Sequence, residues 1–330
     1  MNMDYKKYAI VDLHLHLDGS LSAKAIIEVA EKEGIKLPTY KEEELNKYLM
    51  VPDNCGSLNE YLERFSLPNL VLQSEYGLEH CTLDLLKRLQ NDGLKYVEIR
   101  MAPQLSTDKG LTQEKVVTIL IKTLKIAEKS GIFSNLILCM MRGNNTKEKN
   151  LETIRVAHKF LGKGVVAMDL AGAEGLFPNE MFKEEFSLIN KLGIPLTIHS
   201  GEAAGASSVA SALKFGAVRI GHGIKSIEDD GVIKELIKKG VTLEVCPKSN
   251  LDTKTISKYE DLPLREFIKK GVKVSINTDD MTVSNTSLKQ EYETLAKLGF
   301  SEENLQEFAA NSIKCSFATD KIKDYLLSLI

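Results

Sequence analysis

Two histidines near the start of the sequence are spaced so that they can bind one ligand together. His14 and His16 lie two positions apart in the alternating apolar run 9–17, and residues two apart on a β-strand point to the same side. Two neutral imidazoles on one strand make half of a divalent metal site, and zinc is the usual metal where nitrogen and carboxylate ligands combine. The alternative is a pair of histidines that only form hydrogen bonds in a core or on a sheet face.

Further polar residues stand at the ends of later strand-like runs. His199 lies near the end of one run, His222 follows the next, and Asp279 and Asp280 follow the last. In a barrel of parallel strands these ends meet at one rim, so the residues would share a site. Two imidazoles from one strand, a third imidazole and one carboxylate leave a coordination position for water, as in a catalytic zinc site.

The same rim offers groups for proton transfer. Glu202, three residues after His199, is suited to giving a proton to a substrate. His222 lies between two glycines, which let the backbone approach a ligand closely, and it is either a fourth metal ligand or a base beside the metal-bound water. Only one of Asp279 and Asp280 can face the metal, because neighbouring side chains at a strand end point apart. The alternative for both is a solvated turn.

Eight runs of strand type, rich in Val, Ile and Leu, are available to position these residues. They are 9–17, 96–102, 135–141, 165–171, 196–200, 218–221, 241–246 and 272–277. Helical patterns separate them, and four of these carry a lysine in the last turn before a capping glycine, at Gly131, Gly193, Gly240 and Gly271. This alternation predicts an α/β fold, namely a closed (β/α)8 barrel of the TIM type. An open doubly wound sheet is the runner-up, but no Gly-x-Gly-x-x-Gly motif follows any run.

We expect a single domain over residues 1–330 with extra helices after the first strand and at the C-terminus. An insertion after the first strand lies on the active face of a barrel, so residues 21–95 are expected to form a helical lid. This segment carries an apolar stripe at helical spacing, which is otherwise plain core: Leu58, Tyr61, Leu62 and Phe65. The amphipathic tail 301–330 is expected to pack on the outside of the barrel.

The composition excludes several classes of protein. The net charge is −3 without a long basic run, which argues against a nucleic-acid partner. Five scattered cysteines without a Cys-x-x-Cys pair indicate reduced thiols, and neither a signal peptide nor a membrane span is recognisable. We expect a soluble cytoplasmic protein with a small-molecule partner and no membrane partner, either a monomer or a weak homo-oligomer. His80 and His158 lie in charged helical stretches and are expected at the surface.

Seven motifs, in order along residues 8–320, together resemble those of the adenosine deaminase family in the amidohydrolase superfamily. They are HLHLDGS from His14, YVEIRMAP from Tyr96, DLAG from Asp169, TIHSGE from Thr197, RIGHG from Arg219, VCPKSN from Val245 and NTDD from Asn277. Each motif alone is weak, but seven in register are specific. Two departures are Ser200, where alanine is common, and Met281, where proline is usual.

The resemblance implies zinc-dependent hydrolytic deamination of adenosine, and of 2'-deoxyadenosine, to inosine or deoxyinosine plus ammonia. It implies one Zn²⁺ ion per chain, bound by His14, His16, His199 and Asp279.

The resemblance also implies roles around a purine nucleoside. Glu202 would protonate purine N1, and His222 would orient or deprotonate the attacking water, with Asp279 as the other acceptor for that proton. The groups that hold the substrate would be Asp280 at N7, the backbone amide of Gly172 at N3, Asp18 at a ribose hydroxyl, His16 beside the substrate, and Phe65 as part of the apolar wall.

Other functions stay open beside this one. An adenine deaminase is expected to carry glutamate at the position of Asp18, so this residue favours a nucleoside. A deaminase of a nucleotide, or of a modified adenosine such as aminodeoxyfutalosine, also stays open, because side pockets in the segment 21–95 decide it. A binuclear amidohydrolase commonly uses a lysine at the end of the fourth strand, where this chain has Ala171 and Gly172. A catalytically silent binding protein would lack a ligand or the acid, and all of the proposed residues are present.

Overall fold

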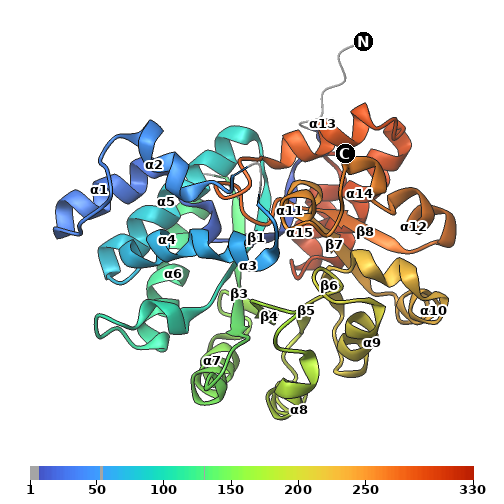
Figure 1. The fold of residues 1–330 in the computed structure, drawn as a ribbon, viewed down its shortest axis with the longest axis horizontal. Helices are drawn as coiled ribbons and strands as arrows, with labels where there is room; N and C mark the ends of the chain where they lie inside the picture. Colours follow the sequence, from blue (N-terminus) through green and yellow to red (C-terminus); the bar gives the residue numbers. More distant parts are fainter. Residues whose placement is uncertain (1–6, 53–54, 130) are drawn as a thin grey trace.

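Eight parallel strands alternate with helices along the part of the chain that the structure describes. This part of the computed structural model comprises residues 7–52, 55–129 and 131–330 (Figure 1). The strands are β1 (Val11–His16), β2 (Tyr96–Met101), β3 (Phe133–Met141), β4 (Val165–Ala171), β5 (Thr197–Ser200), β6 (Arg219–His222), β7 (Thr242–Val245) and β8 (Lys273–Ile276). Each strand begins and ends within two residues of a predicted run.

The strands form one closed ring. β1 to β4 pair in sequence order, and β5 to β8 do the same. Isolated parallel bridges join the two halves, one between Met168 and Leu196 and the other between Leu15 and Asp279. The predicted (β/α)8 barrel is therefore confirmed, and the carboxyl ends of all eight strands meet at one rim.

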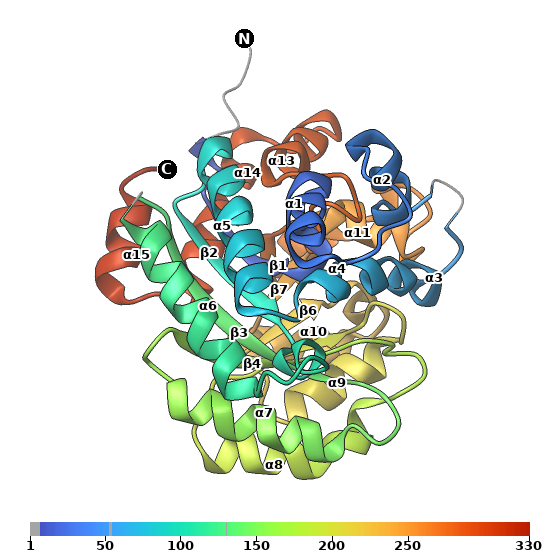
Figure 2. The same cartoon turned by 90° about the vertical axis from the view of Figure 1, so that its left-hand side faces the viewer.

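Helices surround this ring, and Figure 2 shows α5, α6 and α7 side by side on the outer surface. The helices that follow β2 to β7 are α6 (Gln113–Glu128), α7 (Lys147–Phe160), α8 (Lys183–Lys191), α9 (Ala206–Lys214), α10 (Asp230–Lys239), α11 (Pro247–Asp252) and α12 (Leu264–Lys270). Gly240 and Gly271 cap α10 and α12 in the left-handed conformation, with φ of 66° and 78°, as the lysine-glycine endings predict. The strands are buried by these helices on their outer face, which explains their nearly continuous apolar sequences.

Extra helices lie where the sequence predicts them. Between β1 and β2 the chain forms α1 (Ala23–Glu33), α2 (Glu42–Leu49), α3 (Leu58–Leu62), α4 (Ser66–Val71) and α5 (Glu75–Asp92). After β8 it forms α13 (Leu288–Lys297), α14 (Glu302–Cys315) and α15 (Asp320–Leu327). α14 packs against β8 and β1, and α15 packs on α14. None of the helices among the described residues has both the length and the apolar character needed to cross a membrane.

Candidate active site

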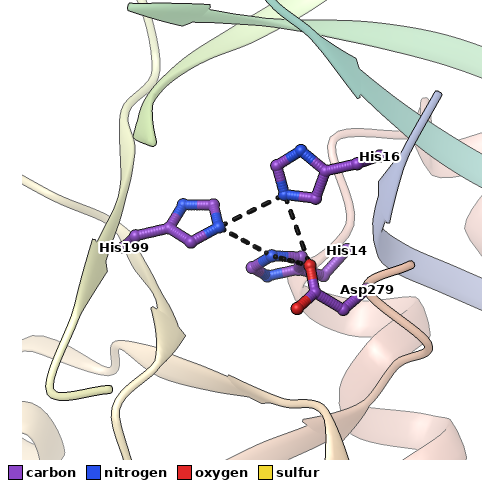
Figure 3. A group of neighbouring side chains, drawn as sticks. All are labelled: His14, His16, His199 and Asp279. Carbon is purple, nitrogen blue, oxygen red and sulfur yellow. Dashed lines mark hydrogen bonds and ion pairs between the residues drawn. The ribbon is translucent and has the colours of Figure 1, made fainter. Parts of the chain in front are cut away.

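Four side chains from three separate parts of the barrel converge at the carboxyl rim (Figure 3). Nε2 of His199 lies 3.0 Å from Nε2 of His14 and 3.2 Å from Nε2 of His16. Oδ1 of Asp279 lies 3.2 Å from Nε2 of His14 and 3.4 Å from Nε2 of His16. A tetrahedral zinc ion with bonds of about 2.0–2.1 Å separates its ligand atoms by roughly 3.3 Å. The four atoms are therefore spaced as ligands of one zinc ion would be.

The hydrogen atoms on these rings also favour a cation. Nδ1 of His14 lies 2.9 Å from Oε2 of Glu244, and Nδ1 of His199 lies 2.8 Å from Oδ2 of Asp169. A carboxylate oxygen can only accept, so each Nδ1 carries a hydrogen, and the Nε2 atoms of the two rings turn toward each other. These Nε2 atoms lie 3.0 Å apart, and a metal ion bound between them would accept a lone pair from each ring. The donor set thus fits the metal that the sequence predicts.

A buried network of charges holds the two carboxylates. Arg100 donates to Oδ2 of Asp169 at 2.7 Å and also contacts Glu244, while Nε of Arg219 lies 2.6 Å from Oε1 of Glu244. Burial alone would raise the pKa of Glu244, but the two guanidinium groups hold that pKa below its usual value. Glu244 therefore stays ionised and can accept from His14. Sequence reasoning missed these partners, although charged residues inside apolar strands were a visible signal.

The loop after β8 is fastened to β1 on both sides of its metal ligand. The backbone N–H of Asp279 donates to the carbonyl of His14 at 2.7 Å, and the carbonyl of Asp279 accepts from the N–H of His16 at 2.8 Å. Asp279 has a φ of 65° and His222 a φ of 61°, a left-handed conformation that is costly for residues with a side chain. Both residues stand at the rim, where such strain is common at functional sites.

Glu202 and His222 lie beside the metal group. Nε2 of His222 is 3.6 Å from Oε2 of Glu202 and 3.8 Å from Oδ2 of Asp279, and Nδ2 of Asn250 lies 3.1 Å from the other ring nitrogen. Burial raises the pKa of Glu202 to about 8, and the negative charges of Asp279 and Glu174 add to this effect. Glu202 is therefore mostly protonated near neutral pH. Burial lowers the pKa of His222 well below its usual value, so this ring is neutral.

A residue that sequence reasoning missed fixes the loop that carries Glu202. Glu174 is 2% exposed, and its carboxylate accepts from the backbone N–H groups of Gly201, Glu202, Ala203 and Ala204 at 2.7, 3.0, 2.8 and 3.0 Å. The hydroxyl of Ser208 donates to it as well. The only signal in the sequence was an acidic residue shortly after the fourth strand. Its many charge-assisted bonds make it the anchor of this loop.

A cavity of about 270 Å³ opens beside the metal group. The predicted site residues that line it are His16, Asp18, Phe65, Gly172, His199, Glu202, His222, Asp279 and Asp280. His14 lies fully buried beneath it. Apolar walls are formed by Leu58, Leu62, Ala102, Leu105, Met141 and Ala171. Such a lining suits a flat ring with polar edges.

Gly19 lies against the site, whereas His80 and His158 lie away from it. Position 19 requires glycine, because the Cβ atom of any other residue would lie 1.6 Å from Oδ1 of Asp280. His80 is partly exposed, with Nε2 2.7 Å from Oε2 of Glu28, and His158 is exposed. His158 thus lies at the surface, as expected, His80 is only partly exposed, and neither lines the cavity.

Known proteins match this chain over almost its whole length. The sequence model of the adenosine deaminase family matches residues 10–330. An adenosine deaminase of Haemophilus ducreyi is 48% identical over 338 residues, covering 100% of this chain and 98% of that protein. An adenosine deaminase of Clostridium botulinum is 42% identical over 333 residues, covering 99% and 98%.

A solved structure shows the same architecture. The adenine deaminase of Arthrobacter aurescens superimposes with a TM-score of 0.88 at 31% identity, and the match covers 97% of both chains. Similarity of this extent in both sequence and fold indicates common descent. The chain belongs to the adenosine deaminase family.

Proposed function

We propose that this protein hydrolyses adenosine and 2'-deoxyadenosine to inosine and deoxyinosine, with release of ammonia, and that it uses one zinc ion. The observation that carries the proposal is the buried acid Glu202 in one cavity with three imidazoles and a carboxylate spaced for zinc. The names of the relatives from Haemophilus ducreyi and Clostridium botulinum support adenosine as the substrate. We further propose that residues 1–330 act as one catalytic unit, with the segment 21–95 as its lid.

The chain supplies both an acid and proton acceptors beside the metal group. Zinc bound by His14, His16, His199 and Asp279 would supply the Lewis acidity that makes water a nucleophile near neutral pH. Addition of that water to purine C6 consumes a C=N bond and breaks the aromaticity of the ring. A proton delivered to N1 by Glu202 neutralises the negative charge that develops there.

Proton acceptors for the attacking water lie close to the acid, with Nε2 of His222 3.6 Å from Oε2 of Glu202. The side chains of His222 and Asp279 both face the metal group, with Nε2 of His222 3.8 Å from Oδ2 of Asp279. The imidazole is neutral and Asp279 is ionised, because burial, which alone would raise the pKa of Asp279, is outweighed by the neighbouring histidines. These two side chains are placed to take the proton and pass it on to the departing amine.

Further side chains hold the nucleoside. Purine N7 has only a lone pair, so the carboxyl group of Asp280 binds it as a donor. Purine N3 has the same requirement, and the backbone N–H of Gly172 meets it. Asp18 lies at the cavity wall and accepts from a ribose hydroxyl, while Phe65 covers the ring from the lid. Together these contacts place C6 next to the metal group.

A substrate panel tests the choice of nucleoside. We expect kcat/KM for adenosine and deoxyadenosine to exceed that for adenine and for adenylate by at least about tenfold. Replacing Asp18 by alanine should lower kcat/KM for adenosine by about 10–100-fold, the usual effect of losing a hydrogen bond to a charged group, and should leave adenine nearly unaffected. The loss of adenosine absorbance measures each rate.

The control for this experiment is Asp324→Ala on the surface of α15, which should behave as the unmodified enzyme. The adenine deaminase from Arthrobacter aurescens makes adenine the main rival substrate. A preference for adenine in the unmodified protein would overturn the nucleoside assignment, and an equal loss for adenine and adenosine in Asp18→Ala would overturn the role of Asp18.

Glu174 gives a second test, because it acts on the loop rather than on the substrate. Glutamine at this position keeps the size of the side chain, but its amide nitrogen cannot accept from the backbone N–H groups of residues 201–204. We expect kcat for adenosine to fall by about 10–100-fold, since several charge-assisted hydrogen bonds are lost. Glu180→Gln, at an exposed position on the same side of the barrel, is the matched control. Wild-type kinetics in Glu174→Gln would show that the loop holds Glu202 without this carboxylate.

A further inference from the structure

The lid contributes a buried hydroxyl group to the purine site. Tyr61 lies in α3, which Figure 1 shows in front of the strands near the centre of the molecule, and its side chain is 1% exposed. The hydroxyl donates to Oδ2 of Asp280 at 2.9 Å and lies 2.8 Å from Oγ of Ser284. Sequence reasoning placed Tyr61 only in an apolar stripe, which does not use its hydroxyl.

The two oxygens of Asp280 have different surroundings. Oδ2 accepts from Tyr61, whereas Oδ1 is buried and has no hydrogen-bond partner among the described residues. Asp280 is 3% exposed and lines the cavity, and buried polar atoms without a partner are rare in folded proteins. Oδ1 is therefore the oxygen whose capacity for a hydrogen bond is still unused.

The contacts around Asp280 fix the rotation of its carboxyl group. Tyr61 has one hydroxyl hydrogen, which it donates to Oδ2, so the hydroxyl of Ser284 donates to the oxygen of Tyr61. On the other side, the backbone at Gly19 packs so closely that a Cβ atom there would overlap Oδ1. A rotation of the carboxyl group away from this orientation would break the bond to Tyr61.

We propose that Tyr61 is a positioning residue that holds Asp280 with Oδ1 toward purine N7, so that the lid takes part in recognition of the base. This inference rests on the proposed function, in which Asp280 donates to N7. Because Oδ2 already accepts a hydrogen bond, the hydrogen that Asp280 donates to N7 sits on Oδ1. The contact also joins α3 to the loop after β8, so the purine site is complete only when the lid is in place.

Removal of the hydroxyl group alone tests this role. In Tyr61→Phe the ring still fills its place, but Oδ2 of Asp280 loses its donor. We expect kcat/KM for adenosine to fall by about 5–50-fold, the range for one buried hydrogen bond. For 7-deazaadenosine, in which a C–H group replaces N7, we expect a change of less than about threefold. The preference of the enzyme for adenosine over 7-deazaadenosine should shrink accordingly, which a purely structural role would not produce.

The matched control is Tyr48→Phe, at an exposed tyrosine of α2 in the same insertion, and it should leave both rates unchanged. An equal loss for the two substrates in Tyr61→Phe would show that the hydroxyl only stabilises the fold, and no loss for either would show that Asp280 is held without it. Either result overturns the inference. If 7-deazaadenosine reacts too slowly, the same ratio is measured with inosine and 7-deazainosine as competitive inhibitors. Failure of the unmodified enzyme to deaminate adenosine would instead contradict the proposed function.

Discussion

Replacing Glu202 by glutamine is expected to lower kcat for adenosine by at least about 10³-fold, within the range attributed to general acid catalysis, while KM changes by less than about fivefold. Glutamine has nearly the same shape and can donate a hydrogen bond to N1, so the substrate still binds. It cannot transfer a proton, however, so the charge that forms on N1 during addition of water is not neutralised. The loss therefore falls on the transition state and not on the ground state.

The structure gives this residue the protonation state that the step requires. Burial raises the pKa of Glu202 to about 8, with Asp279 and Glu174 contributing through their negative charge. An acid with a pKa above its unperturbed value keeps its proton until the pH rises through that pKa, so Glu202 carries a proton at neutral pH. An ordinary exposed glutamate would have lost its proton several pH units lower.

Steady-state kinetics measured by the loss of adenosine absorbance, together with binding of inosine by calorimetry, separate the two effects. Glu228→Gln is the matched control, since Glu228 is an exposed glutamate after β6 and should leave kcat unchanged. Turnover near the wild-type rate in Glu202→Gln would remove this residue from the mechanism. A rise in KM as large as the fall in kcat would assign it to substrate binding.

The fold could be predicted because the apolar runs and the glycines at the helix ends indicated the same alternation of strands and helices. Strands in a barrel are buried on both faces, so they appear as short apolar runs, and glycines such as Gly240 and Gly271 marked the helix ends. The carboxyl ends of eight parallel strands meet at one rim, so the sequence alone predicts that His14, His199 and Asp279 lie close together.

The supporting residues could not be predicted in the same way. Arg100 contacts Glu244 from across the barrel, and such a pairing depends on the stagger of the strands, which apolar spacing does not reveal. Tyr61 has an aromatic ring that fits an apolar stripe, and its hydroxyl meets a partner 219 residues away. Sequence patterns report which face of an element is buried, but not which polar atoms meet inside.

Loss of the metal is expected to have the other large effect. Dialysis against a chelator should remove about one zinc ion per chain and abolish measurable deamination of adenosine, and one equivalent of zinc should restore it. The physical reason is that the Nε2 atoms of His14 and His199 face each other at 3.0 Å, with His16 and Asp279 beside them, so these side chains are spaced to bind the cation that would make water a nucleophile. Elemental analysis of the dialysed protein gives a readout that does not depend on activity.

A variant separates loss of the metal from side effects of the chelator. His199→Ala removes the imidazole that lies within hydrogen-bonding distance of both histidines of β1, and it leaves three of the four proposed ligands. We expect the zinc content of this variant to fall well below one per chain. Added zinc should raise the melting temperature of the wild-type apoprotein, but it should leave the melting temperature of the variant unchanged. His158→Ala, at an exposed position on α7, should keep both properties. Full zinc content in His199→Ala, or full activity in the zinc-free protein, would contradict the assignment of these side chains as the metal site.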